Sequence, residues 1–448
     1  MAETRVEAIR RLARRGALAP LRRTLGKSRP VDIASAIGHL APTEQRTVLG
    51  ALTDDDDAAE VLARVDAAEL QNLVRGLPFD RLVLLLDTMD VDDEADVIEQ
   101  LPDELRSRVL QAIEHDDKVL VEDILAWPED SAGGIMQPIA FRLNEKLTCR
   151  DAITTLHEKQ DDLESIFYLY VENDADQLVG VTSLRALLTN PPSTVLQDIM
   201  ATDVITASPV DDQEIVARLV SRYDLLAIPV VDENRHMLGI VTIDDVVDVI
   251  QEEALEDMML MAGVGQEPDP SVGGVVGVAR QRLTWLLVTL VGGIGMAELI
   301  GVFENALAQK AVLAGFIPVM LGMGGNVGIQ AATVAVRNIA VGHDQNTSIP
   351  SMLYREARIG LILGFAFALT LGGYALVRWY SEPLIALSIA GAIISTVCTA
   401  AILGAVVPLT LNRLKVDPAI ATGPFVTTGI DLLAILIYFS TAKIILDL

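Results

Sequence analysis

Cysteine and histidine are scarce in this chain of 448 residues, which has two cysteines, Cys149 and Cys398, and five histidines. One cysteine falls in a polar region and the other in an apolar run, so a disulfide between them is not expected. Few histidines disfavour Zn²⁺ and Cu²⁺ sites, whereas plentiful carboxylates favour Mg²⁺ or Ca²⁺. The sequence also has no phosphate-binding loop, no triad-like constellation and no His/Cys cluster, so we do not expect an enzyme.

Basic residues are outnumbered, since 34 Lys and Arg face 62 Asp and Glu for a net charge of −28. The first 275 residues hold 24 basic and 54 acidic residues, and the remainder hold ten and eight. This acidity argues against nucleic acid or an anionic membrane surface as a partner and favours a surface that attracts cations. The early arginines, such as Arg10 and Arg14, are not followed by an apolar core. We therefore recognise no signal peptide and expect the acidic region to stay in the cytosol.

Five apolar runs in the second half are each long enough to cross a bilayer. They cover residues 283–302, 312–336, 359–377, 384–411 and 420–446. With the acidic region inside, seven Lys and Arg flank the spans on the inner side and three on the outer side. The chain is therefore expected to be a multi-pass protein of a plasma membrane, of the bacterial inner-membrane type. Its N-terminal domains would be cytoplasmic and its C-terminus outside.

Asp431 is a carboxylate inside the fifth apolar run. A helix starting near Ile420 would place it about 16 Å in, about halfway across a bilayer. A charge there costs a few kcal/mol, so such residues typically face a water-filled path, and a lone carboxylate suits a cation. Gly423 and Thr427 lie eight and four residues earlier on the same helical face, and Pro424 frees a carbonyl near Ile420. The alternative is a protonated or helix-paired Asp that only packs the bundle.

The second apolar run has four glycines together with Asn326 and Gln330 within residues 318–330. We interpret this stretch as a broken or thinned helix that exposes carbonyls and amides to a pore. The alternative is that the small residues simply allow close packing between helices.

A sequence repeat occupies residues 135–250. Ile135-Met136 is echoed by Ile199-Met200 after 64 residues, and a motif around Gly180 recurs around Gly239 after 59 residues. Short β-branched segments and amphipathic helices lie between these motifs. The pattern resembles a tandem cystathionine-β-synthase (CBS) domain pair, a module that is usually regulatory and often dimerises.

Acidic residues crowd the helical regions on both sides of this repeat. Residues before it have helix ends at spacings that suggest stacked pairs in a small superhelix, with acids at the turns. Solvated caps are the alternative for any one of these acids. After the repeat, Asp245, Asp248, Glu252 and Glu256 form one helical stripe. Like charges at this spacing destabilise a helix, so a bound cation would relieve the repulsion and its loss would push acidic faces apart. The stripe is therefore a candidate gate.

These patterns predict a multi-domain membrane protein. It would comprise an all-α N-terminal superhelical domain (1–129), an α/β tandem CBS pair (130–250), a connecting helix (251–275) and an all-α transmembrane domain of five helices (276–448).

Taken together, the chain resembles the MgtE family of Mg²⁺ channels and transporters over essentially its whole length. The resemblance rests on Pro318 to Gln330, Asp417-Pro418-Ala419, and Pro424, Thr428 and Asp431 in the fifth run, together with the order of the domains. It implies a homodimer with the pore along its axis. It also implies that Asp431 is the pore carboxylate, with Gly423 and Thr427 offering backbone oxygens. We place Asn326 with this pore group.

The resemblance further implies a Mg²⁺-selective channel that cytosolic Mg²⁺ closes, since bridged carboxylates would shut the pore and their repulsion would open it. The expected regulatory Mg²⁺ ligands are Asp92, Asp96, Glu214, Asp224, Asp245, Asp248, Glu253, Glu256, Asp257 and Asp417.

ATP regulation is doubtful on the sequence. Some members of the family bind ATP in the CBS pair, where an Asp of the first repeat is expected to hold the ribose. Here Arg185 is followed by Ala186 and not by an acid, although Tyr168 and Arg185 could still contact a nucleotide.

Two other readings stay open. An ion-coupled exchanger or exporter of Mg²⁺, Mn²⁺ or Co²⁺ with a CBS regulator would be favoured by further titratable groups in the spans, for which Glu298 and Glu304, in or near the first run, are the only candidates. A membrane-anchored signalling protein without transport would not explain a carboxylate in the fifth run beside a Gly-rich second run.

Overall fold

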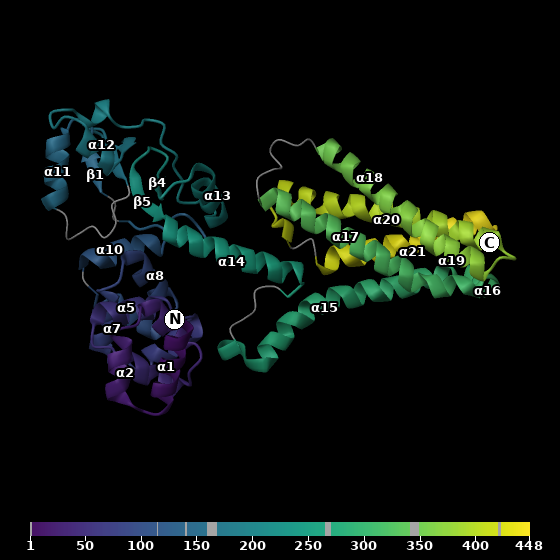
Figure 1. Cartoon of the computed structure of the whole chain (residues 1–448), viewed down its shortest axis with the longest axis horizontal. Coiled ribbons are helices and arrows are strands. Elements are labelled where there is room, and N and C mark those ends of the chain that lie inside the picture. The colour runs from purple at the N-terminus through teal and green to yellow at the C-terminus, as the bar shows by residue number, and fades with distance from the viewer. Residues whose placement is uncertain are drawn as a thin grey trace. The chain divides into compact units, whose positions relative to one another are not determined.

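The structure is a computed structural model that describes residues 2–113, 115–138, 141–158, 168–264, 270–340, 349–419 and 423–448. The chain forms two compact units, Met1–Glu252 and Glu253–Leu448. Figure 1 shows the elements of both units.

The described residues of the N-terminal region form a stack of short helices (Figure 1). They are α1 (Ala2–Arg14), α2 (Leu18–Leu25), α3 (Pro30–Ile37), α4 (Pro42–Leu49), α5 (Asp55–Ala63), α6 (Ala67–Val74), α7 (Phe79–Leu86), α8 (Val91–Glu99), α9 (Asp103–Val109) and α10 (His115–Ile124). Proline begins α3 and α4, where its fixed φ suits the first helical position. The Asp54 carboxylate accepts a hydrogen bond from the Asp56 N–H and caps α5. Leucines, isoleucines, valines and alanines fill a continuous core between the helices, which confirms the predicted all-α domain.

The CBS pair contains two small sheets. In the first, β1 (Arg142–Asn144) pairs parallel with β2 (Leu169–Glu172), which pairs antiparallel with β3 (Leu178–Thr182). In the second, β4 (Ala227–Val231) and β5 (Met237–Thr242) form an antiparallel hairpin. The helices of this region are α11 (Cys149–Glu158), α12 (Leu184–Thr189) and α13 (Gln213–Tyr223), with a 3₁₀ turn at Leu196–Asp198.

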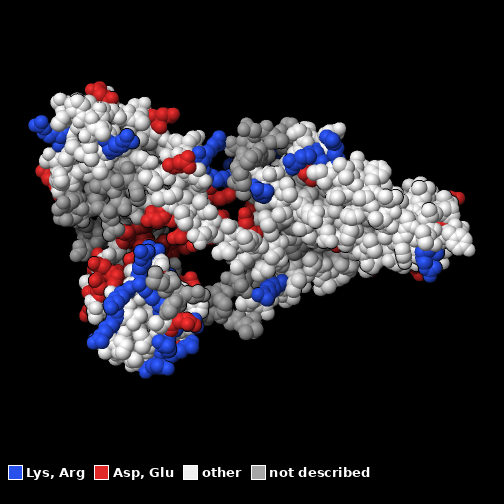
Figure 2. Space-filling model, in the orientation of Figure 1, with Lys and Arg blue, Asp and Glu red and all other residues white. Residues whose placement is uncertain are grey.

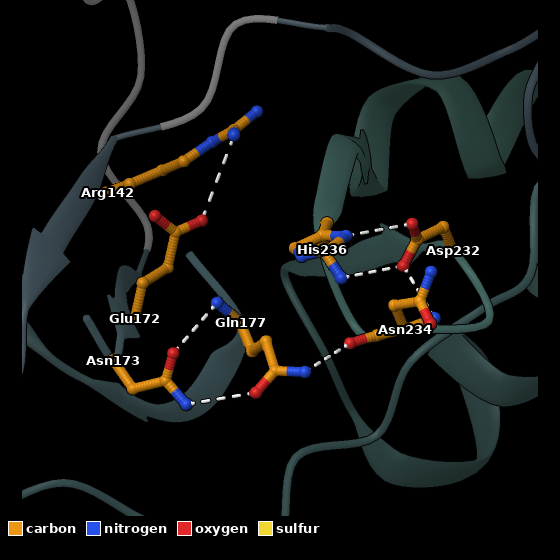
Figure 3. A network of polar contacts seen from close by, with 7 residues as sticks. All are labelled: Arg142, Glu172, Asn173, Gln177, Asp232, Asn234 and His236. Atoms are coloured by element: carbon orange, nitrogen blue, oxygen red, sulfur yellow. Dashed lines mark hydrogen bonds and ion pairs between the residues drawn. The ribbon is translucent and has the colours of Figure 1, made fainter. Parts of the chain in front are cut away.

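The two repeats meet through equivalent hairpin turns, shown in Figure 3. Asn173 and Asp232, 59 residues apart, each accept backbone N–H bonds within their own turn. Asn173 also pairs with Gln177 at 3.1 Å, and Asp232 with His236 at 3.0 Å (Figure 3). Gln177 Nε2 then donates to the Asn234 carbonyl at 2.9 Å, which joins the two repeats. The internal repeat read from the sequence is therefore a structural repeat.

The second unit is helical. After α14 (Ile243–Met261), which begins in the first unit, come α15 (Pro270–Val302), α16 (Glu304–Gln309), the 3₁₀ helix η3 (Ala311–Phe316), α17 (Ile317–Ala340), α18 (Ile349–Phe367), the π-helix η5 (Ala368–Gly372), α19 (Gly373–Arg378), α20 (Pro383–Arg413) and α21 (Pro424–Leu446). Among the described residues, five segments are long and apolar enough to span a membrane. They are Val276–Val302, Ala311–Ile339, Pro350–Arg378, Pro383–Arg413 and Val426–Leu446, which confirms the predicted five spans. The strongly buried α20 packs against α17, α18 and α21 (Figure 1).

Candidate functional site

Asp431 lies on α21 and is half-buried within the bundle. Because the described helix begins at Pro424, Asp431 is about 10 Å from its start, and not 16 Å as predicted. Ile420, whose carbonyl we expected Pro424 to free, lies outside the described residues. The side chain faces α17, since an ideal Cβ at Gly325 would lie 3.6 Å from Asp431 Oδ1. The absence of a side chain at Gly325 thus leaves space beside the carboxylate.

Gly423, the N-cap of α21, and Thr427 in its first turn precede Asp431 and bond to each other. The Gly423 carbonyl accepts the Thr427 N–H at 3.4 Å and the Thr427 hydroxyl at 3.3 Å. Both lone pairs of this carbonyl therefore have a partner within the helix start. Asn326, next to Gly325 on α17, is exposed. The structure thus places Asn326 and Asp431 on two neighbouring spans, and Gly325, which precedes Asn326 in the sequence, faces the carboxylate.

The prediction of a broken second span is wrong for the Gly-rich segment, because α17 is a continuous α-helix over Ile317–Ala340. Two of its glycines, Gly324 and Gly328, serve close packing, the alternative given above, whereas a Cβ at Gly322 would have no neighbour within 4 Å. A Cβ at Gly328 would lie 2.1 Å from Ile430 Cδ1, and one at Gly404 would lie 2.3 Å from the Gly328 carbonyl oxygen. Tighter 3₁₀ geometry is found just upstream, in η3. The small residues therefore let α17, α20 and α21 approach closely without interrupting the helix.

The end of α14 packs against the Asp417-Pro418-Ala419 loop within the second unit. Leu260 is buried with Val336 and Ala419, one residue beyond the Asp417-Pro418 pair. Asp417 Oδ1 accepts the Ala419 N–H at 2.7 Å, which shapes this loop. A Cβ at Gly423 would lie 3.3 Å from the Leu260 carbonyl oxygen, so α14 ends directly against the start of α21. Movement of α14 would therefore change the packing at the start of α21, the helix that carries Asp431.

A second group of carboxylates gathers in the first unit, where α8 faces the start of α14. Asp92 is only 9% exposed, and its Oδ1 has no hydrogen-bond partner among the described residues. Burial, together with the charges of Asp245, Asp93 and Asp90, raises the pKa of Asp92 to about 8. A buried carboxylate oxygen without a donor or a cation is costly. Figure 2 shows acidic side chains gathered around this part of the first unit.

Neighbouring carboxylates also have pKa values that burial and nearby negative charges raise. Desolvation, with the charges of Asp93 and Glu129, raises the pKa of Asp96 to about 7. Desolvation raises the pKa of Asp93 and of Asp245 to about 6 each, although the Thr242 hydroxyl lies within hydrogen-bond distance of Asp245. The two elements that carry these groups therefore repel each other whenever the carboxyls are ionised.

The structure does not bring all ten predicted regulatory ligands together. Glu214 and Asp224 are ten residues apart at opposite ends of α13, and Glu214 pairs with Arg218 at 3.4 Å. Glu253, Glu256 and Asp257 follow on the second half of α14, and Asp248 is exposed on its first half. Within the described ranges, no group of three or more His, Cys, Asp or Glu converges closely enough to hold a metal ion.

The chemistry of the donor atoms in the α8–α14 group nevertheless suits a hard cation. Their oxygen donors suit Mg²⁺, and the unsatisfied Oδ1 of Asp92 is the kind of atom that a cation or its water shell would satisfy. The predicted ligand set did not contain every member of the group. It lacked Asp93, Glu99, Glu129 and Asp244, and also Glu252, which the sequence placed in the acidic stripe but not among the ligands. Asp93 and Asp244 adjoin predicted ligands, whereas nothing in the sequence pointed to Glu129, which comes from the loop after α10.

The two predicted nucleotide contacts lie in the CBS pair. Tyr168 packs at the interface of the repeats, and its hydroxyl lies 3.5 Å from the Leu226 nitrogen. Arg185 is exposed on α12. Tyr168 thus belongs to the contact between the repeats, and Arg185 lies on the surface.

Glu356 is a carboxylate that our sequence reading missed. The third span is longer than predicted and includes Glu356, which is 5% exposed and paired with Arg355 at 3.1 Å. The prediction that Glu298 and Glu304 are the only titratable candidates in the spans is therefore wrong. Glu356 was missed because Arg355 and Arg358 lower the hydropathy of this stretch, so that the apolar run appeared to start at residue 359.

Comparisons with known proteins agree with this layout. Residues 317–441 match the MgtE divalent cation transporter family, residues 28–130 match the MgtE intracellular N domain, and residues 196–252 match a CBS domain. The chain is 34% identical over 431 residues to the magnesium transporter MgtE of Bacillus subtilis (strain 168), covering 96% of this chain and 95% of that protein. It is 33% identical to the magnesium transporter MgtE of Thermus thermophilus over 95% of each chain.

Two solved structures resemble the soluble region. One is the cytosolic domain of the Mg²⁺ channel MgtE in complex with ATP, with a TM-score of 0.51 and 33% identity over 56% of this chain and all of that one. The other is the soluble part of a magnesium transporter, with a TM-score of 0.50 and 26% identity over 57% of this chain and all of that one. This chain is a multi-pass membrane protein with an intracellular N-terminal domain and is not an enzyme. It belongs to the MgtE family of magnesium transporters.

Proposed function

We propose that this chain is a Mg²⁺-selective channel of the plasma membrane that cytosolic Mg²⁺ closes. Mg²⁺ is then both the transported ion and the regulator. The observation that carries the proposal is that one helix, α14, links the acidic group to the helix that carries Asp431. The start of α14 holds Asp245 among the carboxylates of α8, and its end packs Leu260 against Ala419 and beside Gly423, where α21 begins.

At low Mg²⁺ the carboxylates around Asp92 and Asp245 repel each other and favour separation of α8 from α14. Cytosolic Mg²⁺ offers positive charge between them and favours the close arrangement. The remaining predicted ligands add charge of the same sign along α13, along α14 and in the Asp417 loop. The end of α14 then rests on the start of α21 and keeps the path past Asp431 closed.

The transport path would run past Asp431 on α21, beside Asn326 and Gly325 on α17. Gly423 and Thr427 form the cytosolic start of this path and bond to each other in the structure. Two copies of the chain, with their Asp431 carboxylates facing across a dimer axis, would hold one hydrated Mg²⁺ by charge and water-mediated hydrogen bonds. Because five crossings start from an intracellular domain, we place the C-terminus outside.

We leave ATP out of the proposed function. The resembling cytosolic domain was solved with ATP, but here Ala186 follows Arg185 where an acid would hold the ribose. Binding of labelled ATP to the purified full-length protein tests this, and saturable binding that Tyr168→Ala abolishes would contradict it.

A coupled exchanger is the second candidate, and the buried Glu356 in the third span is the observation that favours it. Uptake into proteoliposomes separates the two. A channel should carry Mg²⁺ whenever a membrane potential is imposed, without any gradient of protons or Na⁺, whereas an exchanger should require such a gradient. Uptake that depends on the gradient, and that Glu356→Gln uncouples, would replace the channel by the exchanger.

A further inference from the structure

The first two helices carry a concentration of positive charge that the net charge of the chain conceals. Residues 1–29 contain nine Lys and Arg and two Glu, within a chain of net charge −28. Figure 2 shows Lys and Arg side chains gathered over the part of the N-terminal region where Figure 1 places α1 and α2. The carboxylates around Asp92 gather elsewhere in the same unit, near α8 (Figure 2). The first unit is therefore electrostatically two-sided.

Packing explains why this charge is displayed on one surface. Ile9 of α1 and Leu21 and Leu25 of α2 are fully or almost fully buried in the core. The basic side chains on the opposite faces and in the following loop are therefore left outside. Arg5 Nη1 donates to the Lys27 carbonyl at 3.1 Å and holds α1 against the end of α2. We define the basic patch as the exposed residues Arg11, Arg15, Arg22, Arg23, Lys27 and Arg29.

The basic patch has few internal counter-charges. In the described part of the chain, no Asp or Glu oxygen lies within 4.0 Å of a side-chain nitrogen of these six residues. The adjoining Arg14 has one weak pair, with Glu44 at 3.9 Å. Unpaired guanidinium groups in an otherwise acidic protein are available to an external anion.

We propose that the basic patch binds the anionic phospholipid headgroups of the inner membrane leaflet. Clustered Lys and Arg on a helix surface are attracted by an anionic leaflet. Leu18 at the start of α2 is 50% exposed among these residues, which adds the apolar contact that interfacial helices use. Five spans in the same chain tether the intracellular domain to a bilayer, so the effective concentration of lipid is high.

Lipid is favoured over nucleic acid or an acidic protein because lipid is the anionic surface to which this chain is already tethered. The whole-chain charge argued against an anionic membrane surface. That argument fails locally, because all six residues of the basic patch are positive and a charge acts over a Debye length of only about 8 Å at physiological salt.

Fluorescence quenching in nanodiscs tests the proposal on the full-length protein. A fluorophore is attached at Ala19→Cys, an exposed position on α2, after both native cysteines are replaced by alanine. The discs contain phosphatidylcholine alone or with phosphatidylglycerol, together with a lipid that carries a nitroxide on its headgroup. The test variant replaces Arg11, Arg22 and Arg23 by Gln. The matched control replaces Arg75, Arg150 and Arg222, which are exposed outside the patch, by Gln.

We expect strong quenching only in discs with phosphatidylglycerol, and its loss at high salt. The triple patch variant should lower the ratio of membrane-bound to free domain by on the order of 100-fold, while the control retains it. Equal quenching in both lipids would overturn the proposal, as would quenching that survives removal of the three arginines. Phosphatidylglycerol-independent quenching that the patch variant abolishes would point to an acidic protein surface instead and would equally overturn it.

Hydrogen exchange of the protein with its native cysteines is an independent measurement if the labelled protein fails to assemble. Amides of residues 10–29 should exchange several-fold more slowly in discs with phosphatidylglycerol than in phosphatidylcholine discs. Identical exchange in the two lipids would contradict lipid binding.

Discussion

Asp431 on the fifth span and Gly325 on the second lie face to face, with 3.6 Å between Asp431 Oδ1 and the position that a Cβ on Gly325 would take. A carboxylate in an apolar span and a residue without a side chain thus share one contact between helices. This relationship leads to the first two predictions.

Replacing Asp431 by Asn should lower Mg²⁺ uptake by on the order of 100-fold, because it removes the charge that attracts the ion within the spans. Uptake is measured with a Mg²⁺-sensitive dye in proteoliposomes that hold equal amounts of protein. The control is Asp447→Asn, which neutralises a carboxylate just beyond the end of the same helix and should leave uptake unchanged. Normal uptake by Asp431→Asn at normal protein levels would remove Asp431 from the pore.

Replacing single glycines of α17 by alanine should separate effects on helix packing from effects on Mg²⁺ flux. Gly328→Ala should cost about 1–3 kcal/mol and lower the melting temperature, because its Cβ would lie 2.1 Å from Ile430 Cδ1. Gly325→Ala should keep stability but reduce Mg²⁺ flux, because its Cβ would sit beside Asp431. Gly322→Ala, with nothing within 4 Å of its Cβ, is the matched control. A Gly325→Ala protein with unchanged flux would mean that the ion does not pass this contact.

The fold was largely predictable from sequence, because five apolar runs and a repeated CBS motif are patterns of composition and spacing. The state of the Gly-rich span was not predictable. Gly324 and Gly328 are equally compatible with a loosened helix and with tight packing, and only the neighbouring Ile430 and Thr396 decide between them. Glu129 could not be assigned to the carboxylate group, because its proximity to Asp96 arises from tertiary contact and not from helical spacing.

Neutralising Asp245, Asp248 and Glu256 together, as Asn and Gln, should leave the pore open at high cytosolic Mg²⁺. The variant loses cation ligands that favour the close arrangement, while remaining carboxylates such as Asp92, Asp93 and Asp244 still repel one another. Limited proteolysis of the full-length protein reports the arrangement: Mg²⁺ should protect the wild-type soluble region and not the variant. The control neutralises Glu104, Asp123 and Asp203, which are exposed at other positions of the first unit. Equal Mg²⁺ protection of wild type and triple variant would contradict the gating proposal.

Mg²⁺ protection should weaken as the pH falls. Asp92 and Asp96 have pKa values raised to about 8 and about 7, so both must lose protons to bind a cation. Without Mg²⁺, the stability of the close arrangement of α8 and α14 depends on pH in the opposite direction. Because the carboxyl pKa values are raised in this arrangement, it is most stable below about pH 4, and its stability is lost as the pH rises through about 8.

The midpoint Mg²⁺ concentration for protection should therefore rise roughly 10-fold between pH 8 and pH 7. Asp92→Asn should flatten this dependence, whereas Asp203→Asn should preserve it. A midpoint independent of pH in the wild-type protein would show that these carboxyls do not bind the regulatory ion.

Recording from inside-out membrane patches tests the central claim most directly, because it sets the cytosolic Mg²⁺ concentration while measuring the current. With Mg²⁺ as the only permeant cation, we predict unitary currents at low cytosolic Mg²⁺ whose open probability falls steeply as cytosolic Mg²⁺ is raised. The current should return when the ion is washed out. An open probability that stays constant across this range would contradict gating by cytosolic Mg²⁺, and the absence of any Mg²⁺ current in patches that contain the protein would contradict the channel itself.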